Sequence, residues 1–121
     1  MDYSQLSDFE INKQVAICIH PDIKNWNCYD VSGRACFVIN EGTPKRVQYG
    51  FSFTSDPADA WPIITVNLIS LMHDESLGKW CAGKPYWVDG CEWQLDIDVM
   101  DENPLRAAMI FFLMMQDANH A

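Results

Sequence analysis

The acidic residues of one predicted strand, residues 92–99, are the first candidates for chemistry. Glu92, Asp96 and Asp98 alternate with apolar side chains, so they share one face of that strand. Carboxylates two residues apart on a strand lie about 6.5–7 Å apart, close enough to share a hard cation such as Mg²⁺ or Ca²⁺. The sequence places no second set of ligands near them. The solvated face of an antiparallel sheet is therefore the favoured interpretation, and a metal site is the alternative.

Arg106 is the second candidate, because it is the only charged residue between Pro104 and Gln116. It stands in the first turn of a predicted helix, where a cation opposes the helix macrodipole. A structural ion pair with a carboxylate is the favoured interpretation, with Asp59 as the first choice of partner and Asp101 as the second. The functional alternative is that Arg106 faces a pocket and binds an anion with its planar fork of donors.

The third candidate for function is the high tryptophan content, five residues among 121. Trp61 and Trp93 recur with apolar neighbours at core-facing positions, which predicts that both are buried. The other three lie in predicted loops or near strand ends, where we expect them to cover the sheet. If they were exposed instead, they would mark a surface for a partner. The candidate partner surface comprises Trp26, Trp80, Trp87, Asp96 and Asp98.

Other patterns typical of catalysis or metal binding do not occur. The sequence has no Ser/His/Asp order, no zinc-protease helix motif and no glycine-rich phosphate loop. Five cysteines without a C-x-x-C pair indicate free, mostly buried thiols rather than disulfides or a zinc site. These cysteines are Cys18, Cys28, Cys36, Cys81 and Cys91. We therefore expect no catalytic residue, no metal and no cofactor.

The helices that position these residues begin at capping sequences. A capping box over residues 7–10 starts the first helix, and the His-Pro step at residues 20–21 ends it. Residues 56–57 start the second helix, in which we expect Pro62 to produce a local kink or a tightened first turn but no break. The third helix, predicted over residues 103–115, is apolar nearly all round. A helix of that kind must be covered on more than one side.

The strands are predicted between the helices, over residues 36–39, 46–53, 69–73, 79–82 and 92–99. Residues 22–33 have the composition of a loop, and residues 83–91 that of a loop or bulge. The prediction is an α+β fold in one domain, residues 1–121: a mostly antiparallel sheet of four or five strands, packed with three helices. The last strand should lie at an edge or extend past the helices, because burying its carboxylates unpaired would be costly.

The charge balance limits the partners. Eight basic and 17 acidic residues give a formal net charge of −9, which argues against binding to nucleic acid or to an anionic membrane. The first ten residues lack the apolar segment of a secretory signal, and the longest apolar run is about half of what a membrane span needs. We expect a cytoplasmic protein that is a monomer or a homodimer.

Three segments resemble the NinX-type proteins of lambdoid bacteriophages: residues 3–12 (YSQLSDFEIN), 56–64 (DPADAWPII) and 103–115 (NPLRAAMIFFLMM). The last two also resemble the phage "ABA sandwich" domain, which implies an alternative three-layer α/β/α fold. The resemblance implies a small accessory protein in the cytoplasm of the host bacterium, and it supplies no catalytic residue. Its motif residues, which we expect to be structural, are Asp56, Pro57, Asp59, Trp61, Asn103, Pro104 and Arg106.

These observations favour a non-enzymatic module that binds another protein, of the host or of the phage, in the infected cell. An acidic decoy, which presents carboxylates where a host DNA-binding protein expects phosphates, is one alternative. A small metal-dependent enzyme that uses the acidic strand face is the other. A decoy needs carboxylates spread over one elongated face, whereas an enzyme needs them to converge in a pocket. A binding module needs neither but should expose an aromatic patch.

Overall fold

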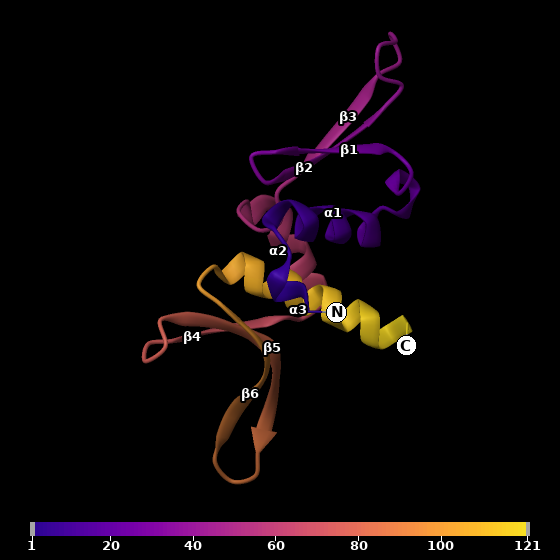
Figure 1. Ribbon diagram of the computed structural model, residues 1–121. Coiled ribbons are helices and arrows are strands. Elements are labelled where there is room, and N and C mark those ends of the chain that lie inside the picture. Colours follow the sequence, from indigo (N-terminus) through magenta and orange to yellow (C-terminus); the bar gives the residue numbers. More distant parts are fainter. Residues whose placement is uncertain (1, 121) are drawn as a thin grey trace.

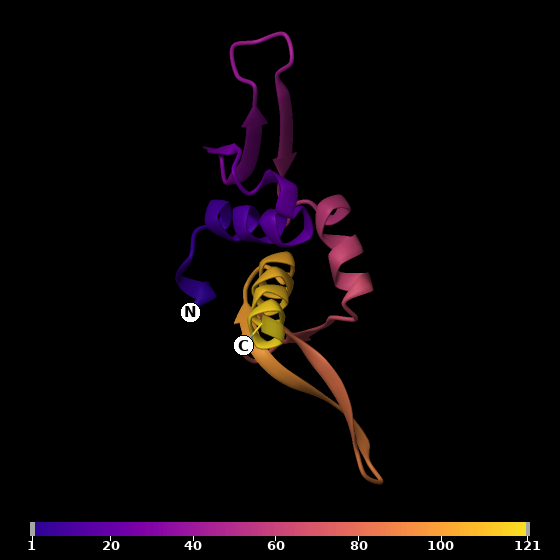
Figure 2. The ribbon, with the colours of Figure 1, turned by 90° about the vertical axis from the view of Figure 1, so that its right-hand side faces the viewer.

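The computed structural model describes residues 2–120, and its three helices lie in a layer between two sheets (Figures 1 and 2). The helices are α1 (Asp8–Ile19), α2 (Pro57–Val66) and α3 (Pro104–His120), with short 3-10 turns η1 (Tyr3–Gln5) and η2 (Pro21–Ile23). The first sheet contains β1 (Asn27–Val31), β2 (Arg34–Ile39) and β3 (Val47–Phe51) in that order. The second contains β4 (Ser70–Asp74), β5 (Lys79–Val88) and β6 (Glu92–Asp101) in that order. Every strand pair is antiparallel.

The α+β class and the three helices are confirmed, but the strands are divided between two three-stranded sheets instead of forming one. The order of the layers is sheet, helices, sheet, so the α/β/α alternative is wrong (Figure 1). The composition of α3 explains this arrangement. Residues 107–113 are all buried, because α1 and α2 cover one side of the helix and β5 and β6 cover the other. The predicted cover on more than one side is confirmed.

The predicted helix starts are confirmed by their hydrogen bonds. The Ser7 hydroxyl accepts from the Glu10 amide at 3.2 Å, and it donates to the Glu10 carboxylate at 3.1 Å. The Ser7 cap is as predicted, but the Glu10 carboxylate bonds to the Ser7 hydroxyl and not to the Ser7 amide that a capping box uses. Asp56 accepts from the Ala58 amide at 2.9 Å, and α2 continues past Pro62 without interruption. These caps satisfy amides that have no partner within the helix.

Two segments predicted as loops are strands. Residues 27–31 form β1, an edge strand whose mostly exposed, polar side chains lack the alternation by which a strand is recognised. β5 continues through Gly83 and Pro85 to Val88, with a register shift at Ala82/Gly83 that matches the predicted bulge. β4 pairs with β5 only as far as Gly83. Pro85 thus lies where one side of β5 has no neighbouring strand, the position at which proline is tolerated.

Tyr3 joins the start of the chain to the end of α3. Its side chain is buried, and its hydroxyl donates to Asp117 Oδ2 at 2.5 Å. Burial, together with the hydrogen bond to the Asp117 carboxylate, raises the pKa of Tyr3 to about 12. The folded state therefore holds the phenolic proton more tightly than an unfolded chain, in which tyrosine titrates near pH 10.

We predict that this proton makes the fold sensitive to alkali. The stabilisation is complete below about pH 10 and is lost as the pH rises towards about 12. Near neutral pH, Tyr3→Phe should lower the free energy of unfolding by about 0.5–1.5 kcal/mol, because one hydrogen bond is lost. Urea denaturation of both proteins should show this difference shrinking between about pH 10 and 12. A difference that stays constant across that range would contradict the prediction.

Candidate functional site

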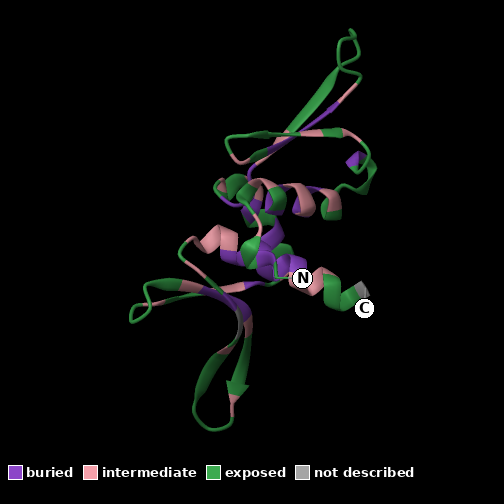
Figure 3. Ribbon diagram, viewed as in Figure 1, coloured by how far each residue is buried: buried purple, intermediate pink, exposed green. Residues whose placement is uncertain are grey.

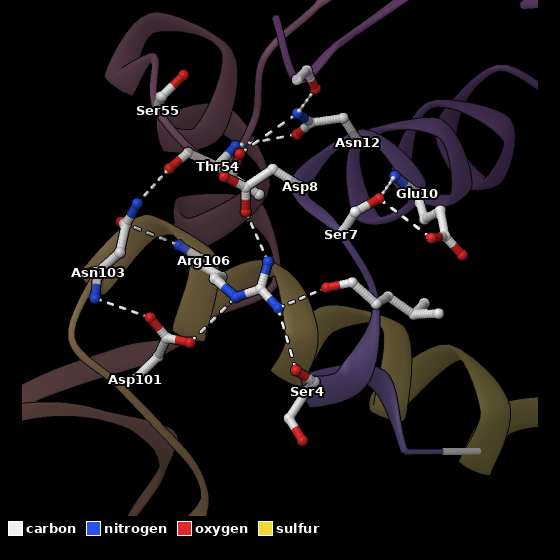
Figure 4. A network of polar contacts seen from close by, with 12 residues as sticks. Ser4, Ser7, Asp8, Glu10, Asn12, Thr54, Ser55, Asp101, Asn103 and Arg106 are labelled. Carbon is white, nitrogen blue, oxygen red and sulfur yellow. Dashed lines mark hydrogen bonds and ion pairs between the residues drawn. The ribbon is translucent and has the colours of Figure 1, made fainter. Parts of the chain in front are cut away.

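The Arg106 side chain lies at the centre of a polar network where four segments of the chain meet (Figure 4). Its Nη1 donates to Asp8 Oδ1 at 2.6 Å, and its Nε donates to Asp101 Oδ2 at 3.1 Å. Its Nη2 donates to the carbonyls of Ser4, at 3.2 Å, and Leu6, at 2.7 Å. The guanidinium thus links η1, the start of α1, the end of β6 and the start of α3. These contacts support the structural interpretation of Arg106 over anion binding.

The predicted pair between Arg106 and Asp59 is wrong. Asp59 Oδ2 instead accepts from the Ser52 amide at 2.9 Å. Asp101, the second choice of partner, is one of the two carboxylates that Arg106 contacts. The other, Asp8, stands in the first turn of α1, where an anion is also favoured. A carboxylate in the first turn of a neighbouring helix does pair with Arg106. Asp8 and Asp59 both stand in such a turn, and α1 and α2 both pack against α3, so the sequence could not choose between them.

Asn103 and Asn12 extend this network. Asn103 Oδ1 caps α3 by accepting from the amides of Leu105 and Arg106, and its Nδ2 donates to the Thr54 carbonyl at 2.7 Å. Asn12 is buried and binds Thr54 twice: its Oδ1 accepts from the Thr54 amide and its Nδ2 donates to Thr54 Oγ1. Asn103 at the start of α3 and Asn12 within α1 therefore hold the turn before α2 against these two helices. Thr54 lies in no motif, and Asn12 ends the family-like segment 3–12 but was not among the residues singled out.

The tryptophans divide into covered and exposed residues. Trp26 is half-buried and stacks on Tyr49, with 5.7 Å between ring centroids, and half-buried Trp80 lies against His73 at 5.0 Å. The expected cover is confirmed for these two residues. Trp87 is instead 52% exposed.

The prediction that Trp61 and Trp93 are buried is wrong, since they are 60% and 68% exposed. Trp61 points away from the side of α2 on which Ala60, Ile63 and Ile64 are buried. Trp93 follows the predicted alternation along β6, but its part of the strand extends past the helices (Figure 3). An apolar strand face predicts burial only where another element covers it.

The projecting end of the β5–β6 hairpin, residues 84–96, is here called the hairpin arm (Figures 1 and 3). Trp87 lies opposite Trp93, and their rings meet edge to face at 5.5 Å. Pro85 lies opposite Leu95 on the same face, so one face of the arm is apolar. The other face carries Tyr86, Glu92, Gln94 and Asp96, all exposed. The predicted position of the acidic strand, at a sheet edge and past the helices, is confirmed.

The acidic face has no sign of a metal centre in the part of the chain that the structure describes. No three His, Cys, Asp or Glu side chains among those residues are placed to hold a metal ion. Asp98, a member of the predicted acidic face, lies outside the residues whose side chains are described. All five cysteines are free thiols, but only Cys36 and Cys81 are buried, and Cys18 and Cys91 are exposed. The expected burial of most thiols is therefore wrong.

One family model matches nearly the whole chain. The model of the family "Bacteriophage P22, NinX" matches residues 2–116. The chain belongs to the NinX family of phage proteins. The NinX match covers both sheets, the hairpin arm and the whole Arg106 network, including the stretches in which the sequence alone showed no motif. No curated protein and no solved structure matches the chain. None of the described helices is long and apolar enough to cross a membrane.

Proposed function

We propose that this NinX-family protein is a non-enzymatic module that binds another protein in the infected bacterial cell. The apolar face of the hairpin arm is the contact surface. The observation that carries the proposal is the pair of exposed rings, Trp87 and Trp93, side by side on that face. Tryptophan is among the residues that contribute most to protein–protein affinity when a partner buries them. An exposed aromatic patch is also the feature that separates a binding module from a decoy or an enzyme.

The charge of the hairpin arm indicates a basic partner. Residues 85–96 contain three carboxylates, those of Asp89, Glu92 and Asp96, and neither lysine nor arginine. Lys84, at the base of the arm, donates to the carbonyls of Asn67 and Leu68, so its ammonium is directed at the body of the protein. A lysine- or arginine-rich surface would gain cation–π contacts with the tryptophans and ion pairs with the carboxylates. The partner is therefore a protein with a positively charged surface.

The hairpin arm can change without disturbing the core. The buried residues described in the second sheet, residues 81–83 and Val99, lie nearer the helices than the arm. Surface substitutions away from a packed core usually change stability by less than about 0.5 kcal/mol. Replacing both tryptophans of the arm should therefore leave the melting temperature close to that of the wild type. Binding and folding can be measured separately for this reason.

The test is capture of the partner from phage-infected cells with tagged full-length protein. Trp87→Ser/Trp93→Ser should reduce capture of any specifically bound basic protein about tenfold or more. The matched control is Trp61→Ser, which removes an equally exposed tryptophan from α2 and should capture as the wild type does. Unchanged capture by the double variant, with its melting temperature preserved, would refute the proposal.

The acidic decoy predicts a different pattern in the same experiment. A decoy depends on its carboxylates, so Glu92→Gln/Asp96→Asn would abolish capture while Trp87→Ser/Trp93→Ser would leave it intact. A binding module that uses both apolar contact and charge loses more capture when the two tryptophans are replaced than when the two carboxylates are, because exposed ion pairs contribute about 0–1 kcal/mol each. The ratio of the two losses in capture therefore distinguishes a binding module from a decoy.

A further inference from the structure

A cavity of about 310 Å³ lies at the edge of the first sheet, where β3 meets η2 and the end of α1. It is lined by His20, Asp22, Ile23, Tyr49 and Phe51. Its volume is at the lower end of the range for ligand-binding pockets, which suits one small group or one side chain. The first sheet and the hairpin arm lie on opposite sides of the helical layer (Figures 1 and 2), so this cavity is separate from the surface assigned above.

Aromatic rings form most of the cavity wall. Tyr49 and Phe51 are two residues apart on β3 and therefore share one face of the strand. The His20 ring stacks on Phe51, with 5.5 Å between centroids and 29° between planes. The Trp26 ring stacks on Tyr49, at 5.7 Å and 18°. These two stacks hold the Tyr49 and Phe51 rings against neighbouring rings beside the cavity.

One carboxylate completes the wall. Asp22 is the only Asp, Glu, Lys or Arg among the lining residues, and it lies in η2 beside buried Ile23. The two ion pairs found among the described residues both involve Arg106, so no described lysine or arginine pairs with Asp22. The cavity thus combines aromatic surfaces with a single negative charge. That combination is the one by which proteins bind organic cations.

We propose that this cavity binds a guanidinium group, that of an arginine side chain in a partner polypeptide. A guanidinium is flat and delocalised, so it can stack on the half-exposed Tyr49 ring while its parallel N–H groups donate to the Asp22 carboxylate. A lysine ammonium offers the same charge but no flat surface, and it is more strongly hydrated. The site therefore selects arginine over lysine. A small peptide or a free arginine derivative presents the same chemistry.

The test is a titration of the full chain with capped arginine, N-acetyl-arginine amide, followed by backbone amide NMR. Saturable shifts are expected at residues 20–23 and 49–51. Asp22→Asn should weaken binding about five- to tenfold, because an exposed charge-assisted hydrogen bond is lost. Asp89→Asn, which removes the same charge from the tip of the hairpin arm, is the matched control and should bind as the wild type does.

Two further ligands test whether the cavity selects a guanidinium group. Capped lysine should bind several-fold more weakly than capped arginine, and capped tyrosine should produce no saturable shift at the cavity. Equal binding of arginine and lysine, or equal binding by wild type and Asp22→Asn, would overturn the proposal, as would the absence of saturation. Trp87→Ser/Trp93→Ser should leave these shifts unchanged. The outcome of the titration is therefore independent of the proposed role of the hairpin arm.

Discussion

Replacing Arg106 with methionine is expected to lower the free energy of unfolding by about 2–4 kcal/mol. The substitution leaves the carboxylates of Asp8 and Asp101 without their cation and the carbonyls of Ser4 and Leu6 without their donor. Breaking a fully buried pair costs about 3–5 kcal/mol. The expected loss is set lower here because the Asp8 side chain is 51% exposed, although that of Arg106 is only 16% exposed. Urea denaturation measures the difference.

Double-mutant cycles separate the pair that the structure contains from the one that the sequence suggested. Arg106→Met and Asp101→Asn remove two ends of one contact, so their combined cost should be clearly less than the sum. Arg106→Met and Asp59→Asn should be additive, because Asp59 bonds to Ser52. Arg106→Lys should fall between wild type and Arg106→Met, since it keeps the charge but lacks the fork of donors. Coupling with Asp59 instead of Asp101 would contradict the network described here.

Gly83→Ala is expected to cost about 2–3 kcal/mol, within the range for forcing extra atoms into a packed region. A Cβ at Gly83 would lie 1.9 Å from the Asp96 carbonyl oxygen, so the backbone of β5 or β6 would have to move at the bulge. The same change at Gly50 is the control, because a Cβ there would meet the flexible end of the Arg34 side chain, 2.6 Å away. Gly50→Ala should cost less than about 1 kcal/mol. Similar melting temperatures for the two variants would show that β5 and β6 do not approach so closely.

The helices were the most predictable part of the fold because their signals are local. The capping residues Ser7, Asp56 and Asn103 bond within three residues of themselves, and the structure confirms each of them. The apolar circumference of α3 likewise predicted its cover on two sides. The sequence could not show that two separate sheets flank this layer. Every described strand pairs only with a strand next to it in the chain, and nothing in the strand sequences shows whether β1–β3 and β4–β6 join into one sheet.

The candidate sites were less predictable because each depends on how helices and strands from distant parts of the chain pack against one another. The alternation along β6 placed Trp93 on an apolar face, which is correct, but the helices do not reach that part of the strand. Asp8 and Asp59 both stand in the first turn of a helix, where a carboxylate that could pair with Arg106 is favoured. In the folded protein Asp8 is the one that pairs with it. The aromatic cavity brings together residues from η2 and β3, about 30 positions apart in the sequence. No short motif could have joined them.

Site-specific photo-crosslinking in phage-infected cells tests the central claim, that the apolar face of the hairpin arm binds a basic protein. A photoreactive phenylalanine derivative is placed at Trp93, at Trp87 or, as the control, at Trp61, which is exposed on α2. A crosslinked adduct with one positively charged protein is expected from positions 93 and 87, and none from position 61. When the crosslinking is repeated in a lysate of the infected cells, the yield of adduct should fall as salt is raised, because the partner is held partly by exposed charges. Adducts from position 61 alone, or from none of the three positions, would show that the hairpin arm is not the binding surface.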